Sequence, residues 1–292
     1  SVSFTLNTTY GINLLLNQLK PELFDKVMTS DIEHNSPFLS TMSFSRRNHV
    51  PREIMQRNAD GSIDLDNYDF KRALVVVNCA SNFDGRKLLN LKELIKKVHA
   101  ADGVIIVDAA QALAHSPEIL YKTDADAICG SAHKMYGPSL GVMIVRRDLF
   151  SKIDTTFIGG GMVDDVDKES YKLSAESQNH AYTKFESGLQ AWGEIIAYGE
   201  AIKWLEHLSK DTKKNFEAQC QRLFEYLSSH DKIELINQEA NPTMSFYIKG
   251  LDSHLAGEAL STQGIMARTG YFCVHYYLDH VMHYPPLIRF SL

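Results

Sequence analysis

The stretch "CGSAHKMYGPSLGVMIVRR", residues 129–147, places a histidine beside a lysine where an apolar run gives way to Gly and Pro. "DAICGS" at 126–131 and "GVMIVRR" at 141–147 read as buried strands on either side of this turn. Some ten residues separate them, which is short for a helical crossover, so we expect the pair to be antiparallel or bent around a loop. Lys134 is therefore either a solvent-exposed lysine at the end of a strand or a lysine that takes part in chemistry.

Further buried strands precede this turn and alternate with amphipathic segments. "ALVVVNCAS" at 73–81 and "GVIIVDAAQ" at 103–111 are rich in β-branched residues and read as strands. Between them, "LLNLKELIKKVHAAD" at 88–102 has apolar residues at helical spacing. This alternation predicts an α/β fold, with a mostly parallel mixed sheet covered by helices on both faces.

A change of composition near residues 205–215 predicts a domain boundary. The highly charged "LEHLSKDTKKN" follows the helical segment "AWGEIIAYGEAIKWLEHL". We predict a large domain at 1–208 and a smaller C-terminal α+β domain at 209–292, which contains a helix closed by Gly264. Both ends are abrupt, so we expect each domain to be trimmed at its terminus.

Composition excludes several classes of protein. The net charge of -6 provides no basic surface for nucleic acid. Every apolar run is shorter than the ~20 residues of a membrane span, so no membrane association is expected. The four cysteines include no CxxC pair, which argues against a zinc ribbon or a disulfide framework. We predict a cytoplasmic protein.

Polar residues gather at the expected strand ends, which is where open α/β sheets bind ligands. They are Asn78, Asp108, Ser131, His133 and Lys134, and the "NTTYG" turn at 7–11 adds Thr8 and Thr9 ahead of a helix. Hydroxyls at a helix N-terminus are suited to a phosphate. Pyridoxal phosphate needs a lysine for its aldehyde, a carboxylate for its ring nitrogen and hydroxyls for its phosphate. Lys134, Asp108 and Thr9 could meet these demands.

Plainer interpretations stay open for the same residues. Asp108 could cap a helix that begins near Ala110, and Thr8 and Thr9 could be capping residues with or without a ligand. Lys134 could still be a solvated strand end.

Ordered motifs along the whole chain carry a resemblance to a known family. They are "FTLNTTYGIN", "SDIEHNSPFL", "VVVNCASN", the long stretch from "VDAAQ" to "LFSKI", "KFESGLQ" and "ARTGYFC". In these motifs the chain resembles the class V, fold-type I pyridoxal-phosphate-dependent aminotransferase family, and within it the group II cysteine desulfurase and selenocysteine lyase branch. The resemblance implies a PLP-dependent transferase fold and a homodimer.

The resemblance also implies roles for individual residues. Lys134 would hold the cofactor as a Schiff base, Asp108 would pair with the pyridinium nitrogen, and His34 would lie against the ring face. Other residues would bind the cofactor or the substrate: Gln111 and Asn78 at the ring oxygen, Thr8, Thr9, Ser131 and His133 at the phosphate, and Asn78 and Arg289 at the substrate carboxylate. His34 has a plainer interpretation as an ordinary loop histidine.

The resemblance assigns the role of nucleophile to Cys273. Attack on the sulfur of L-cysteine would leave a persulfide on the enzyme and release L-alanine, with Arg268 or His275 favouring the thiolate. A sulfur-acceptor protein is then a possible partner. Cys273 could instead be a small buried hydrophobic residue. The alternatives are a class V aminotransferase, epimerase or lyase that acts on another amino acid without this cysteine, and a non-catalytic scaffold of the same fold.

Three departures from the family's pattern bear on these expectations. Tyr10 stands where relatives often have an acidic residue. Leu189 stands where they usually have a threonine that reaches the neighbouring subunit's phosphate, and a leucine cannot donate that hydrogen bond. "VHYYLDH" after Cys273 replaces the usual small residue and proline. Its histidines, with His283, lack the spacing of a metal site, and we predict no metal.

Overall fold

The computed structural model describes residues 1–115, 122–174 and 180–292, and these residues form two compact units. The first unit comprises residues 1–30, 36–79 and 88–206. The second comprises residues 31–35, 80–87 and 207–292. The two units are described separately below.

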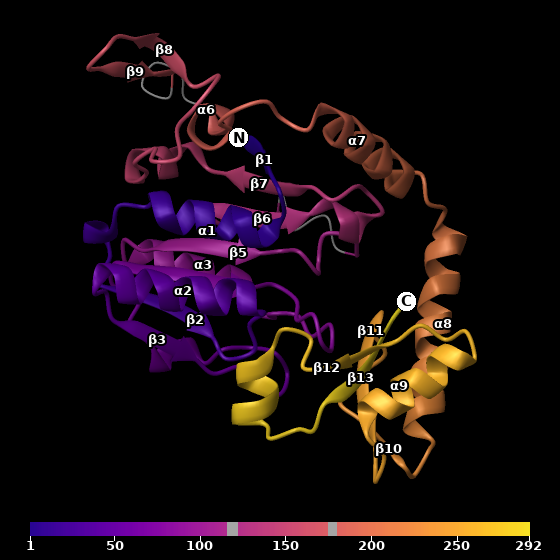
Figure 1. Ribbon diagram of the computed structural model, residues 1–292. Helices are drawn as coiled ribbons and strands as arrows, with labels where there is room; N and C mark the ends of the chain where they lie inside the picture. The colour runs from indigo at the N-terminus through magenta and orange to yellow at the C-terminus, as the bar shows by residue number, and fades with distance from the viewer. Residues whose placement is uncertain (116–121, 175–179) are drawn as a thin grey trace. The chain divides into compact units, whose positions relative to one another are not determined.

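A seven-stranded sheet forms the centre of the first unit (Figure 1). Its strand order is β1-β7-β6-β5-β4-β2-β3. The strands are β1 (Val2–Thr5), β2 (Lys26–Ser30), β3 (Arg52–Met55), β4 (Ala73–Asn78), β5 (Val104–Asp108), β6 (Ala127–Ser131) and β7 (Gly141–Val145).

The strand directions confirm the predicted mixed sheet. Strands β3, β2, β4, β5 and β6 run parallel to one another, whereas β7 is antiparallel to both β6 and β1. The short turn between β6 and β7 thus joins an antiparallel pair, as its length predicted. Parallel strands end at the same edge of a sheet, and the register places Asn78 beside Asp108 and Asp108 beside Cys129.

Helices cover both faces of this sheet. Helices α1 (Thr8–Gln18) and α2 (Asn35–Asn48) contribute Ile12, Leu15 and Phe44 to a core that also contains Val76 and Ile106. Along β4 and β5, the residues that alternate with Val76 and Ile106 point to the opposite face of the sheet, and they are also fully buried. Helix α3 (Leu91–Ala100) buries its apolar side and contacts β5. The helices run alongside the strands in Figure 1.

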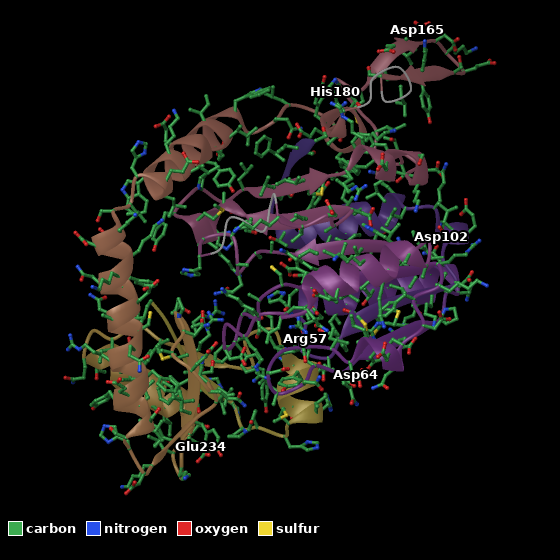
Figure 2. The ribbon with its side chains drawn as sticks, turned by 180° about the vertical axis from the view of Figure 1, so that it is seen from behind. Arg57, Asp64, Asp102, Asp165, His180 and Glu234 are labelled. Carbon is green, nitrogen blue, oxygen red and sulfur yellow. The ribbon has the colours of Figure 1, made fainter. Side chains whose placement is uncertain are left out.

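The rest of the first unit consists of short elements and one long helix. The 3₁₀ turns are η1 (Pro21–Leu23), η2 (Leu65–Asn67), η3 (Ala132–Met135) and η4 (Arg147–Lys152). Strands β8 (Val163–Val166) and β9 (Tyr171–Leu173) form a two-stranded hairpin, and Asp165 lies on its exposed strand β8 (Figure 2). Helices α6 (Ala181–Phe185) and α7 (Trp192–Glu206) complete the unit.

The second unit has its own antiparallel sheet in the order β10-β11-β13-β12. Its elements are α8 (Lys210–Ser228), β10 (Ile233–Leu235), β11 (Thr243–Ile248), α9 (Ser253–Thr262), β12 (Arg268–Gly270), the π-helix η5 (Tyr276–Val281) and β13 (Leu287–Ser291). Gly264 follows α9 with a positive φ of 75°, in the place predicted for the helix end.

Two short segments from the first third of the chain belong to this second unit. Ile32 and Phe83 are fully buried in one apolar cluster with Phe272, Tyr277 and Leu287. The Oγ of Ser245 also donates a hydrogen bond to the backbone carbonyl of Phe83. The predicted division at residue 208 considered only position along the chain. The contacts show that residues 31–35 and 80–87 pack with residues far beyond that point.

Candidate active site

Lys134 lies in the short turn that links the antiparallel strands β6 and β7. The turn closes because Tyr136 adopts a left-handed conformation, with φ of 59°, and because the N–H of Gly137 donates to the carbonyl of Ala132. Lys134 is half-buried, and its Nζ donates to Oε1 of Gln111 at 3.3 Å. The amine of Lys134 is thus directed to Gln111, three residues after the end of β5, and the lysine is not a fully solvated strand end.

Asp108 ends β5 and is buried. Burial raises the pKa of its carboxyl group, while the N–H of Ala110 and the charge of Lys134 act in the opposite direction. Its Oδ1 accepts the Ala110 N–H at 2.9 Å, so the capping bond weighed as the plainer interpretation is present. That bond uses one oxygen. The other oxygen therefore keeps the capacity to accept a hydrogen bond from a cationic ligand.

Hydroxyl groups surround the N-terminus of α1. Oγ1 of Thr8 lies 2.5 Å from Oγ of Ser131, which also accepts the Thr8 backbone N–H at 3.1 Å. Oγ1 of Thr9 lies 2.6 Å from Oγ of Ser36. The N-cap is Asn7, whose side chain accepts the N–H of Tyr10 at 2.9 Å, so neither threonine is the capping residue. Because Asn7 caps the helix, α1 begins at Thr8, within the segment 7–11 that was predicted to be a turn ahead of the helix.

His133 and Asn78 differ in their surroundings. His133 is exposed, and partial burial together with the charge of Lys134 lowers its pKa. Asn78 is buried, and its Oδ1 accepts from Nη2 of Arg57 at 2.9 Å. The same nitrogen donates to the Asn78 carbonyl at 2.7 Å. Arg57, labelled in Figure 2, is itself only 7% exposed. The sequence analysis did not single out Arg57, and nothing in its local sequence marks it as buried.

The other candidate residues lie in the second unit. His34 is half-buried and follows β2 by four residues in the chain. Cys273 is exposed, whereas Cys79, Cys129 and Cys220 are buried. The alternative interpretation of Cys273 as a buried hydrophobic residue is therefore wrong. Phe272 and Cys273 both have positive φ, 49° and 62°, which is rare for residues other than glycine.

Arg289 lies on β13 in the same unit. Burial, followed by the charge of Arg268, lowers the pKa of Arg289 to about 10, while Cys273 acts in the opposite direction. Its Nη1 donates to the carbonyl of Asn82 at 2.8 Å, and its guanidinium lies 5.0 Å from the centre of the Phe272 ring. Its Nε is buried and has no hydrogen-bond partner within the described chain. An unsatisfied guanidinium N–H fits the predicted carboxylate ligand.

Asn82 is a residue that the sequence analysis missed. Its Nδ2 donates to the carbonyl of Phe272 at 2.7 Å, and its own carbonyl accepts from Arg289. Its Oδ1 is buried without a partner in the part of the chain that the structure describes. The residue thus contacts both Arg289 and the Cys273 loop. Asn82 stands in the quoted motif "VVVNCASN", where Asn78 was chosen because it directly follows the apolar run.

The histidines after Cys273 do not form a metal site. Across residues 1–115, 122–174 and 180–292, no three His, Cys, Asp or Glu side chains gather as a metal site would require. His275 contacts Asn35 and the ring of Tyr271, and Nδ1 of His283 donates to the carbonyl of Asp279. No described helix has the length and apolar character needed to cross a bilayer.

The donor set of the first unit fits pyridoxal phosphate. A buried carboxyl group suits a protonated ring nitrogen, a half-buried amine suits an aldehyde, and hydroxyls at a helix N-terminus suit a phosphate. Asp108, Lys134 and the Thr8–Ser131 pair supply these groups. All of these residues lie at or just after the ends of strands in one sheet, so the sheet brings together residues that are distant in the sequence.

Comparison with known proteins places the chain in a family. The family model described as aminotransferase class-V matches residues 1–292. The chain belongs to the aminotransferase class-V family. This match confirms the family predicted from the ordered motifs. With the fold described above, it also confirms the prediction of a pyridoxal-phosphate-dependent enzyme.

Individual class V relatives are similar over most of the chain. A probable cysteine desulfurase of Pyrococcus abyssi is 28% identical over 288 residues, which cover 93% of this chain and 69% of the relative. A probable cysteine desulfurase of Haemophilus influenzae is 27% identical over 289 residues, covering 95% of this chain and 64% of the relative. The chain thus spans about two thirds of the length of these curated relatives.

Solved structures show the same fold. The apo structure of a cysteine desulfurase from Thermococcus onnurineus NA1 has a TM-score of 0.87 and 26% sequence identity, and the match covers all of this chain and 74% of that one. The Escherichia coli cysteine desulfurase CsdA has a TM-score of 0.90 at 22% identity, covering all of this chain and 73% of that one. The predicted fold-type I architecture is confirmed.

Proposed function

We propose that this class V enzyme is a cysteine desulfurase, which converts L-cysteine to L-alanine and carries the sulfur as a persulfide on Cys273. The observation that carries the proposal is the exposure of Cys273 together with the contact between its neighbour Phe272 and the half-buried Arg289 on β13, whose guanidinium lies 5.0 Å from the centre of the Phe272 ring. A free thiol and a carboxylate-binding group in one unit are what this reaction requires in addition to the cofactor. The similarity to proteins named cysteine desulfurase supports the same activity.

Residues of the first unit would bind the cofactor. Asp108 would hold the proton of the ring nitrogen, and Gln111 and Asn78 would face the ring oxygen. Thr8, Thr9, Ser131 and His133 would bind the phosphate, with the N-terminus of α1 adding favourable dipoles. When bound, pyridoxal phosphate supplies an electron sink that makes the Cα–H bond of an amino acid acidic. Lys134 would take that proton through its amine.

Residues of the second unit would bind the substrate and accept the sulfur. Arg289 would hold the substrate carboxylate through its free Nε–H, and His34 would pack against the cofactor ring. The Cys273 thiolate would attack the substrate sulfur. A new S–S bond forms, the Cβ–S bond breaks, and its electron pair stays with the carbon, which takes up a proton to give alanine. The persulfide could then pass to the thiol of an acceptor protein.

The exposed apolar residues of α7 support the proposal of a homodimer. Trp192 is 60% exposed and Ile196 is 68% exposed, whereas Tyr198 on the same helix is buried and donates to the sulfur of Met135 beside Lys134. Large exposed apolar side chains next to such a site mark an interaction surface. Leu189 is 91% exposed and brings no hydrogen-bond donor to a partner's phosphate. A cytoplasmic location is part of this proposal.

The proposed function is tested with the Cys273→Ser variant and L-cysteine. We expect release of sulfide and alanine to be lost, while the visible absorption band of the bound cofactor stays unchanged. Unchanged turnover would reject the desulfurase reaction and favour a class V enzyme that does not use this cysteine. Mass spectrometry after borohydride reduction separately tests the lysine: a pyridoxyl adduct is expected on Lys134 and on no other residue.

A further inference from the structure

The loop that carries Cys273 has an unusual backbone. Phe272 and Cys273 are consecutive and both left-handed, although neither is glycine. This conformation is unfavourable for a side chain that has a Cβ, and it persists in proteins only where surrounding contacts hold it. The contacts that hold these two residues therefore determine where the thiol of Cys273 lies.

Each of the two strained residues has its carbonyl held by an asparagine from the N-terminal half of the chain. The backbone N–H of Asn35 donates to the Cys273 carbonyl at 2.6 Å. The Nδ2 of Asn82 donates to the Phe272 carbonyl at 2.7 Å. All of these residues belong to the second unit. The loop is thus fixed by long-range bonds in addition to its own local turn.

Asn35 makes a second contact on the far side of Cys273. Its Nδ2 lies 3.2 Å from Nδ1 of His275. Which of the two groups donates depends on the tautomer of His275. Asn35 therefore holds the chain at Cys273 with its backbone and at His275 with its side chain.

We propose that Asn35 is a positioning residue for the Cys273 thiol, a role that rests on the proposed desulfurase function. The N–H that holds Cys273 belongs to the peptide bond between His34 and Asn35. One hydrogen bond therefore connects the residue that would pack against the cofactor ring to the residue that would accept the sulfur. Movement of His34 when cofactor or substrate binds would be transmitted directly to Cys273.

Two variants separate the backbone contact from the side-chain contact. Asn35→Ala removes only the amide side chain. Asn35→Pro also removes the N–H, and proline is tolerated at the first residue of a helix, which is where Asn35 stands in α2. Asn48→Ala is the matched control, because Asn48 lies at the other end of α2 and its Nδ2 donates to the carbonyl of Phe44. Thermal unfolding and circular dichroism verify that each variant is folded.

The first readout is steady-state turnover of L-cysteine by the cofactor-loaded enzyme. Loss of one hydrogen bond is expected to lower kcat about fivefold in Asn35→Ala, and loss of both about 30-fold in Asn35→Pro. The KM is expected to change less than about twofold, because substrate binding is assigned to Arg289. A His275→Phe variant should match Asn35→Ala, and the double variant should be no worse than either one.

The second readout is the rate at which iodoacetamide alkylates Cys273, which is measured without any turnover of substrate. The other three cysteines are buried, so the reagent reports on Cys273. Release of the loop is expected to raise this rate in both Asn35 variants and not in Asn48→Ala. Turnover and alkylation in Asn35→Pro that equal those of Asn48→Ala would overturn the proposal. If instead wild type and Cys273→Ser turn over cysteine equally, the desulfurase function fails, while alkylation still reports whether Asn35 holds the loop.

Discussion

Gly141 provides a sharp test of how the sheet positions the phosphate-binding hydroxyls. It is the register partner of Thr5 on β1 and of Ser131 on β6. A Cβ at this position would lie 2.3 Å from Oγ1 of Thr5, and 2.6 and 2.7 Å from backbone atoms of Asn7. Asn7 is the N-cap of α1, so a methyl group would push on the turn that carries Thr8 and Thr9.

The expected loss of stability in Gly141→Ala depends on which atoms the new Cβ would contact. Overpacking costs about 1–3 kcal/mol, and backbone atoms cannot rotate away as a side chain does, so Gly141→Ala belongs at about 3 kcal/mol. For a chain of this size, that lowers the Tm by about 6–12 °C. We also expect weaker retention of pyridoxal phosphate, measured by the loss of its absorption band on dialysis.

The matched control for Gly141→Ala is Gly160→Ala, in the turn that precedes β8. A Cβ at Gly160 meets no atom within 4 Å, and Gly160 does not have a positive φ, so its Tm should be unchanged. If Gly141→Ala behaved like this control in both Tm and cofactor retention, the close approach of β7 to the Asn7 turn would not be what positions the hydroxyls.

Three further outcomes follow from the structure. Burial raises the pKa of Asp108, so its protonation stabilises the folded cofactor-free protein at low pH, and this contribution is lost as pH rises through the folded pKa. Asp108→Asn should therefore raise the Tm of that form at pH 8 and not at pH 4; an equal Tm difference at both pH values contradicts the assignment. Arg57→Met should destabilise the protein by about 3 kcal/mol, measured by urea unfolding, because it removes the buried guanidinium that donates to both Oδ1 and the carbonyl of Asn78. Ile196→Asp should shift the protein from dimer to monomer in light scattering, and an unaltered dimer would show that α7 lies outside the interface.

The central sheet could be predicted from the sequence because its signals are local. Val75, Val76 and Val77 form a β-branched run that is buried on both faces, and such a run is typical of a parallel strand. The short β6–β7 turn argued against a helical crossover through its length, and the antiparallel pair was one of the two arrangements that it left open. Polar residues at the ends of these strands, such as Asp108, could be grouped because parallel strands end together.

The surroundings of Cys273 could not be predicted in the same way. Asn82 and Phe272 are separated by 190 positions in the chain, and Asn35 and His275 by 240. No periodicity or motif relates residues at such distances, and asparagine in a loop is typical of turns with no further role. Arg57 illustrates the same difficulty, because an arginine is expected at the surface unless its buried partners are known. Residues 8–11 were assigned to a turn instead of α1 for a local reason, since Asn7 was not considered as the N-cap.

The packing of residues 31–35 and 80–87 with the second unit has a consequence for the order of events during synthesis. These segments leave the ribosome early, yet the apolar partners of Ile32 and Phe83 are made only with Phe272 and Leu287. Two stretches of nascent chain must therefore wait, with apolar side chains uncovered, until more than 180 further residues have been added after Phe83. A fragment that ends at residue 207 would lack Phe272 and Leu287 altogether, so Ile32 and Phe83 would stay uncovered. Expression of that fragment alone should therefore give an incompletely packed product.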